Sequence, residues 1–231
     1  ELEREGIRSI LTGHRWLALA NGFNFSNHGI GWLAGGVCRR AQRALDIDPE
    51  VGWVPEAARA CAALRPGDVD LVLTTGSPYC AFGLARQLAL RLNCPYVLDY
   101  RDLWTGNAHA QRPARAATVR EEARLLAGCA AAIVVSESWA GALQSRFQLG
   151  PKLHVVSNGY DPDDLRPVRP YPFGHFAIVY TGRFYPPKRV ILPVMAALQR
   201  LKALPSPPPA GWRFHYYGSH EALVLDAARQ F

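Results

Sequence analysis

Three cationic side chains stand between a strand-like run and a helix-like run in the C-terminal part of the chain: Arg183, Lys188 and Arg189. The run Phe176–Tyr180 is expected to form a strand and Val190–Leu204 a helix. Gly182, just beyond the strand, lets the backbone turn sharply and lets a ligand approach closely. Ligands of open α/β sheets bind at the carboxyl ends of the strands, where cations beside a helix N-terminus suit a diphosphate. The pattern therefore predicts a phosphorylated small-molecule ligand, with a nucleotide-sugar as the first candidate.

Arg183 and Lys188 are the strongest candidates for chemistry in this segment. Arginine can hold a phosphate through two parallel hydrogen bonds and lysine adds a compact charge, so the pair can stabilise a departing diphosphate. The alternative is a solvated basic turn, but the adjoining glycine, strand end and helix favour ligand binding. Arg189 is expected to face solvent or a carboxylate. Gly218, just after the strand expected at Arg213–Tyr217, is predicted to admit the same ligand.

A second loop at a strand end combines an acid, a base and an aromatic residue. Residues 99–104, Asp-Tyr-Arg-Asp-Leu-Trp, come at the end of the strand expected at Tyr96–Asp99. Asp102 can act as a base or bind a hydroxyl group, and Arg101 can bind an anion or orient Asp102. For catalysis by Asp102, an internal Arg–Asp pair that only fixes the loop is the slightly favoured alternative. For the loop as the lining of a cleft, its position at the sheet edge favours function.

Strand-like and helix-like runs alternate along the chain, which predicts α/β units with parallel sheets and crossover helices. The further strands are expected at Val69–Thr75, Ala131–Ser136 and Leu153–Val156. The further helices are expected at Pro78–Leu92, Ala114–Leu126, Glu137–Phe147 and Glu221–Phe231. The proline-rich segment Asn158–Gly174 is predicted to be a linker, because prolines at this density stop helices and weaken strands. Glu1–Gly6 is expected to end a helix and Ile7–Thr12 to form a strand, so the chain is expected to begin inside an element.

Composition limits the classes of partner. The 231 residues are 49% hydrophobic, which allows a buried core, and the formal net charge of +7 favours anionic partners. Five cysteines without a two-residue gap predict no zinc or redox motif and fit a reducing compartment. No apolar run reaches the length of a membrane span, and no ligand spacing for a metal is present. Several arginines are expected to form a mostly solvated face beside Glu121 and Glu122, with contact to anionic lipid as a secondary alternative: Arg112, Arg115, Arg120 and Arg124.

Three motifs, in this order and at about this spacing, resemble those of family-4 retaining glycosyltransferases, two-domain enzymes with the GT-B architecture. The motifs are residues 99–104, Val156–Asp161, and Tyr180–Arg183 with Lys188. The Arg-Asp-Leu-Trp loop is similar to that of the bacterial cell-surface polysaccharide group. Asp48–Ala57 also resembles the stretch that precedes an Asp-Leu-Val strand in that group. The resemblance covers most of residues 46–231.

The resemblance implies a cytoplasmic enzyme of polysaccharide biosynthesis that moves a sugar from a nucleotide-diphosphate donor to an acceptor with retention of the anomeric configuration. The acceptor would be a glycan, a lipid-linked or a small molecule. Two Rossmann-like parallel-sheet domains are expected, an acceptor-side domain over 1–165 and an incomplete donor-side domain over 166–231. The donor-side residues are Gly182, Arg183, Lys188 and Gly218. The acceptor-side residues are Arg101, Asp102, Trp104 and His109, although a lone histidine is more often a surface or hydrogen-bonded residue.

No metal or other cofactor is expected, because the cations Arg183 and Lys188 match those that hold the donor diphosphate in the family. The chain departs from the family pattern in lacking a first strand with its glycine-rich loop and a helix with paired glutamates, so it is expected to be truncated at both ends. Asp102 stands where many members carry a histidine. Peripheral contact with an anionic membrane is an alternative, and nucleic acid is not an expected partner. The rival functions are a nucleotide-sugar epimerase and a non-catalytic nucleotide- or carbohydrate-binding remnant.

Overall fold

The computed structural model describes residues 48, 50–107, 110, 112–184, 186–205 and 211–230. The chain divides into two compact units between Gly159 and Tyr160, which we call the N-terminal unit and the C-terminal unit. The predicted helix end Glu1–Gly6 and strand Ile7–Thr12 lie outside the described residues, as does His109.

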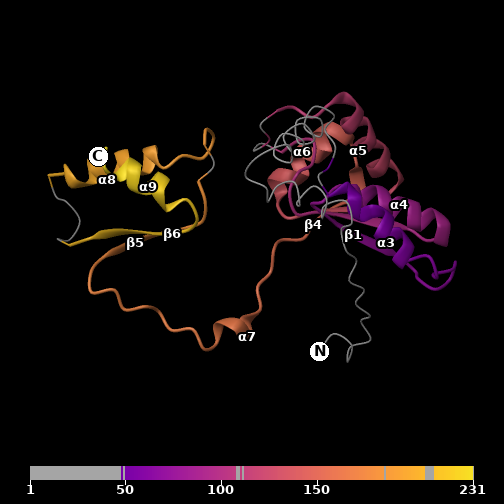
Figure 1. The fold of residues 1–231 in the computed structure, drawn as a ribbon, viewed down its shortest axis with the longest axis horizontal. Helices are drawn as coiled ribbons and strands as arrows, with labels where there is room; N and C mark the ends of the chain where they lie inside the picture. The colour runs from indigo at the N-terminus through magenta and orange to yellow at the C-terminus, as the bar shows by residue number, and fades with distance from the viewer. Residues whose placement is uncertain are drawn as a thin grey trace, which may run out of the picture. The chain divides into compact units, whose positions relative to one another are not determined.

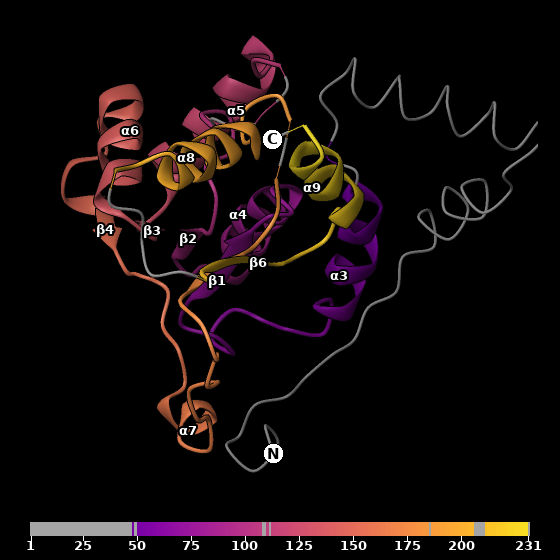
Figure 2. The same cartoon turned by 90° about the vertical axis from the view of Figure 1, so that its left-hand side faces the viewer.

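A parallel sheet of four strands forms the frame of the N-terminal unit, and its strands stand in sequence order, as Figure 2 shows. The strands are β1 (Val72–Gly76), β2 (Tyr96–Tyr100), β3 (Ala131–Val134) and β4 (Leu153–Val155). The crossover helices are α4 (Cys80–Leu92), α5 (Ala116–Gly128) and α6 (Glu137–Phe147). Two 3₁₀ turns, η2 (Val51–Trp53) and η3 (Gly150–Lys152), and the helix α3 (Val54–Ala60) complete the elements described in this unit. Parallel neighbours require such crossovers, so the carboxyl ends of all four strands meet at one edge.

The core of the N-terminal unit lies between the sheet and its crossover helices. Tyr96, Leu98 and Tyr100 alternate along β2 and are all buried, so they face the same side of the sheet. They pack against apolar side chains of α4, α5 and α6: Phe82, Ala89, Leu125, Leu126 and Leu143. Burial of a side chain of this size contributes about 1.5–3 kcal/mol, so these three residues hold β2 firmly against the helices.

The C-terminal unit contains a parallel pair of strands, β5 (Ala177–Thr181) and β6 (Arg213–Tyr217). The helices α8 (Leu192–Lys202) and α9 (Glu221–Ala228) lie on the same side of this pair (Figure 1). Buried side chains of these helices and of the connection between β5 and α8 form a second core: Phe184, Ile191, Met195, Val224 and Ala227. The core of this unit therefore fixes one face of the strand pair and the connection between β5 and α8.

The predicted α/β class with parallel sheets is confirmed, and the bounds of Glu137–Phe147 and Arg213–Tyr217 match. The interpretation of Asn158–Gly174 as a plain linker is wrong in one respect, because the short helix α7 (Pro162–Leu165) interrupts it. Asp161 begins this helix by accepting a hydrogen bond from the Asp163 amide at 2.8 Å, and proline is well tolerated in a first helical turn. The assignment of 1–165 and 166–231 to two Rossmann-like domains stays a prediction.

Candidate functional site

Two glycine loops meet at the carboxyl edge of the β5–β6 pair. The Gly182 amide donates a hydrogen bond to the Tyr217 carbonyl at 3.0 Å, so the pairing of the strands continues into the loops. Gly182 has a φ of +141°, which disfavours any other residue. A Cβ atom on Gly218 would lie 1.9 Å from the Gly182 carbonyl oxygen. Glycine is therefore required at both positions, by conformation at one and by close backbone approach at the other.

Tyrosine hydroxyl groups fix the backbone of these two loops. The Tyr180 hydroxyl donates to the Arg183 carbonyl at 3.2 Å. The Tyr216 hydroxyl lies 3.1 Å from the Gly182 carbonyl and also contacts the carbonyl of Ser219. The rings of Tyr180 and Tyr216 stack with the buried Phe184, which belongs to the core of the unit. The glycine loops are thus tied to the core by side chains of the strands that precede them.

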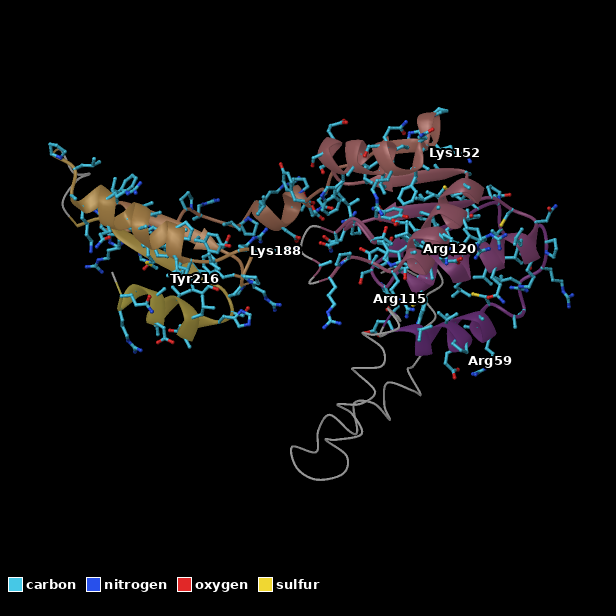
Figure 3. All side chains as sticks on the ribbon, turned by 90° about the horizontal axis from the view of Figure 1, so that it is seen from above. Arg59, Arg115, Arg120, Lys152, Lys188 and Tyr216 are labelled. Carbon is cyan, nitrogen blue, oxygen red and sulfur yellow. The ribbon has the colours of Figure 1, made fainter. Side chains whose placement is uncertain are left out.

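Arg183 and Lys188 are both exposed on the connection between β5 and α8. The buried Phe184 and Ile191 anchor this connection at two points. Lys188 and Tyr216, both labelled in Figure 3, belong to the C-terminal unit. The structure thus brings Gly182, Arg183 and Gly218 to one strand edge and places Lys188 further along the same connection.

In the N-terminal unit, the residues 101–107 form a loop at the end of β2, which we call the β2 loop. The Arg101 amide donates to the Gly76 carbonyl at 3.2 Å, so the loop begins against the end of β1. The Tyr79 hydroxyl donates to the Asp102 carbonyl at 3.0 Å. The Tyr79 ring also stacks on Trp104, with ring centroids 5.3 Å apart and planes inclined by 6°.

The structure contains an internal Arg–Asp pair of the kind that the sequence suggested as an alternative, and its acid is Asp99. Arg101 lies 3.9 Å from Asp99, measured from Nη1 to Oδ2. The Asp99 carboxylate also accepts a hydrogen bond from the Thr75 hydroxyl at 3.0 Å. The Asp102 backbone is held by the Tyr79 hydrogen bond to its carbonyl, and Asp102 is exposed at the sheet edge. The Asp102 carboxylate therefore stands at the sheet edge, and the acid that pairs with Arg101 is Asp99.

Glu122 stands in sequence beside the arginines that are expected on a solvated face, yet its own side chain is buried and 0% exposed. Its Oε2 atom accepts a short hydrogen bond from the Thr105 hydroxyl, and Arg146 of α6 donates to that same hydroxyl at 2.5 Å. Burial raises the pKa of Glu122, and the Thr105 hydrogen bond and the Arg146 charge oppose this rise. Burial raises the pKa of Tyr100 too, and the neighbouring Glu122 charge adds to the effect. Sequence reasoning missed this buried polar cluster.

The basic residues around Glu122 behave as the solvated-face interpretation expects. Arg115 and Arg120, labelled in Figure 3, are exposed at the start of and within α5. Arg124 pairs with Glu121 of the same helix at 2.5 Å, between Nη2 and Oε1. Glu122, in contrast to these exposed arginines, is buried, because it lies on the face of α5 that is turned toward β2 and the β2 loop.

The sequence profile described as Glycosyltransferase Family 4 matches residues 32–164, which is more than half of the chain. The chain belongs to glycosyltransferase family 4. The predicted resemblance is thereby confirmed at the level of the family. No curated protein matches the chain. The four-stranded sheet and the β2 loop lie inside the matched region of this glycosyltransferase, whereas Arg183, Lys188 and Gly218 lie beyond it.

Within the described part of the glycosyltransferase, no group of three His, Cys, Asp or Glu side chains is placed to hold a metal ion. Within the same ranges, no helix has both the length and the apolar character needed to cross a membrane. The cysteines that the structure describes are free thiols: Cys61, Cys80, Cys94 and Cys129.

The contact between the two glycine loops gives a first prediction. Gly218→Ala forces the new Cβ against the Gly182 carbonyl, so the loops must separate, at an expected cost of about 1–3 kcal/mol. Urea unfolding, followed through hydrogen exchange of the β5 and β6 amides, measures this cost. Gly174→Ala is the matched control, because nothing lies within 4 Å of a Cβ there. Equal unfolding midpoints for the two variants would contradict the close approach.

The burial of Glu122 gives a second prediction. Its pKa is raised above the ordinary 4.5 in the folded protein, so the folded state favours the protonated acid. This contribution to stability is complete below the unfolded pKa and is lost as the pH rises through the folded pKa. Relative to Glu122→Gln, which cannot ionise, the wild type should therefore lose unfolding free energy between acid and neutral pH. Urea unfolding at a series of pH values measures the difference.

Glu121→Gln is the control for this series. The hydrogen bond from Arg124 lowers the pKa of Glu121, so its contribution is present above the ordinary pKa and is lost as the pH falls. The two variants should therefore show pH dependences of opposite sign, the Glu121 effect being the smaller because that residue is partly exposed. A pH-independent difference between wild type and Glu122→Gln is the contradictory result.

Proposed function

We propose that the protein is a retaining glycosyltransferase of the GT-B type that uses a nucleotide-diphosphate sugar as donor. In this proposal, residues 1–165 form the acceptor-side domain and residues 166–231 begin the donor-side domain. The acceptor is a glycan, a lipid-linked or a small molecule of the kind used in bacterial cell-surface polysaccharide synthesis. Family membership supports sugar transfer, and the Arg-Asp-Leu-Trp loop supports the narrower group.

The observation that carries the donor site is the contact between the loops of Gly182 and Gly218. The absence of side chains lets the two loops approach each other closely and leaves backbone at the strand edge, where a diphosphate can approach. Arg183 is exposed beside this edge and Lys188 is exposed further along the same connection. An arginine fork and a lysine charge can share the non-bridging oxygens of a diphosphate.

The catalytic logic of this proposal is electrostatic. The bond between the anomeric carbon and the donor diphosphate breaks, and negative charge grows on the departing oxygen. Arg183 and Lys188 stabilise that charge, which is the role that a metal ion fills in other phosphate chemistry. The acceptor hydroxyl then attacks from the face that the diphosphate leaves, so the configuration is retained.

On the acceptor side, we assign binding roles to the β2 loop. The exposed Asp102 can accept a hydrogen bond from the acceptor hydroxyl and so orient it or take its proton. Arg101 and Trp104 complete the predicted acceptor-side set with His109, which lies outside the described residues. We place the enzyme in the cytoplasm, a reducing compartment, because the described cysteines are free thiols. Exposed arginines of α3 and α5, among them Arg59 and Arg120 (Figure 3), support peripheral contact with anionic lipid.

Isothermal titration calorimetry with nucleoside diphosphates tests the donor site. The double variant Arg183→Ala/Lys188→Ala should weaken binding by about a hundredfold or more, because each hydrogen bond to a charged group contributes about 1.5–3 kcal/mol. Arg200→Ala/Lys202→Ala is the matched control, since it removes the same charges from the far end of α8. Unchanged affinity of the first variant contradicts the proposed site.

Product analysis separates the rival functions. A glycosyltransferase consumes the nucleotide-sugar only when an acceptor glycan or lipid is added, and it releases a nucleoside diphosphate. An epimerase interconverts the donor sugar without any acceptor. A binding module shows affinity in the calorimeter and no turnover under either condition.

A further inference from the structure

The β2 loop is held at two places by side chains from other elements. Tyr79, just before α4, holds the first part through the Asp102 carbonyl and the ring of Trp104. Thr105 holds the second part, because its hydroxyl group joins Glu122 of α5 to Arg146 of α6. Asp102 therefore lies on a short segment whose position depends on both attachments.

The direction of the hydrogen bonds through Thr105 follows from the chemistry of its partners. A guanidinium group can only donate, so Arg146 donates to the Thr105 oxygen. The single hydroxyl proton of Thr105 is then free to point at Glu122 Oε2, which accepts it. Arg146, Thr105 and Glu122 thus form a chain of two hydrogen bonds, which we call the relay. It leads from the exposed Arg146 of α6 to the buried carboxyl group of Glu122, and each donor points toward Glu122.

The relay leaves one side of Glu122 unsatisfied. Among the described residues, Glu122 Oε1 and the Tyr100 hydroxyl are the buried side-chain polar atoms without a hydrogen-bond partner. The charged groups and titratable hydroxyls that face this carboxyl are Tyr100 from β2, Arg146 from α6 and Tyr79 from the start of α4. Desolvation favours the neutral form of the Glu122 carboxyl group, whereas the Thr105 hydroxyl and the Arg146 charge favour the carboxylate. Burial and the relay therefore act in opposite directions on the pKa of Glu122.

Arg146 also lies directly against the β2 loop. A Cβ atom on Gly106 would come within 2.5 Å of Arg146 Nη1, so the guanidinium occupies the space beside the Gly106 backbone. The guanidinium carbon lies 4.8 Å from the centre of the Phe147 ring, which steadies its position. A movement of the Arg146 or Thr105 side chain therefore acts directly on the position of the β2 loop.

We propose that Glu122, Thr105 and Arg146 are positioning residues that set the place of the β2 loop, and through it of Asp102, for binding of the acceptor. The proposal rests on the proposed function. The carboxylate form of Glu122 draws the Thr105 hydroxyl and Arg146 inward and holds the loop. Protonation weakens the relay and loosens the loop, so acceptor binding weakens as the pH falls.

The test that does not depend on activity is a ¹⁹F NMR titration of the full chain labelled with 5-fluorotryptophan. The Trp104 signal, assigned with Trp104→Phe, should move with pH in the wild type at a midpoint above the ordinary glutamate value. Glu122→Gln should abolish this movement. Thr105→Val and Arg146→Gln should shift the midpoint upward, because each removes a group that favours the carboxylate.

Glu121→Gln is the control and should leave the Trp104 midpoint unchanged. Persistence of the titration in Glu122→Gln overturns the proposal, and so does a downward shift in Thr105→Val. The second variant keeps the test informative if the first fails to fold. A purely structural role for the relay would change the stability of the protein, but the Trp104 signal would show no movement with pH that depends on Glu122.

Steady-state kinetics separates this inference from the proposed function. Thr105→Val should raise the KM for the acceptor by about tenfold to a hundredfold and leave the KM for the nucleotide-sugar unchanged. If the wild type transfers sugar and the acceptor KM is the same in Thr105→Val, the positioning role is overturned and the function stands. If the Trp104 signal behaves as expected but the wild type transfers no sugar, the proposed function is overturned.

Discussion

The backbone contact between Gly182 and Gly218 is the constraint on which the proposed donor site depends. It requires the parallel pairing of β5 with β6, since only parallel strands bring their carboxyl ends to the same edge. It also requires the hydroxyl groups of Tyr180 and Tyr216, which tie both loops to the core. Any side chain at Gly218 would push the loops apart and occupy space at the strand edge.

The N-terminal unit uses the same edge of its sheet in a different way. Its β2 loop is contacted by the side chain of Tyr79, just before α4, and by that of Glu122 from α5. Glu122 is buried, and a charge on its carboxyl group is costly in an apolar core. A hydrophobic residue in place of Glu122 would avoid this cost, but it would leave the Thr105 hydroxyl, to which Arg146 donates, without its own acceptor. The arrangement therefore lowers stability at neutral pH and fixes the position of the β2 loop, to which we assign acceptor binding.

Local sequence patterns predicted the strands of both units and the helices α4, α5, α6, α8 and α9, because apolar runs of strand length alternate with runs of helical spacing. The short helices α3 and α7 were not predicted. The same patterns predicted Gly182 and Gly218 as special positions. The pairing of Arg101 with Asp99 was not predictable, because the choice between two nearby carboxylates depends on side-chain directions at the strand end. The burial of Glu122 had a detectable signal: Leu125, Leu126 and Cys129 follow it at helical spacings of three, four and seven residues, which places Glu122 on their apolar face.

A backbone amide NMR titration of the ¹⁵N-labelled chain with a nucleoside diphosphate tests the central claim most directly. If a diphosphate binds at the glycine loops, the amide signals of Gly182, Arg183 and Gly218 should shift together and saturate with a single dissociation constant. Signals at the far end of α8, such as that of Lys202, should stay in place. Saturable shifts elsewhere in the chain, with the glycine-loop amides unmoved, would contradict the account.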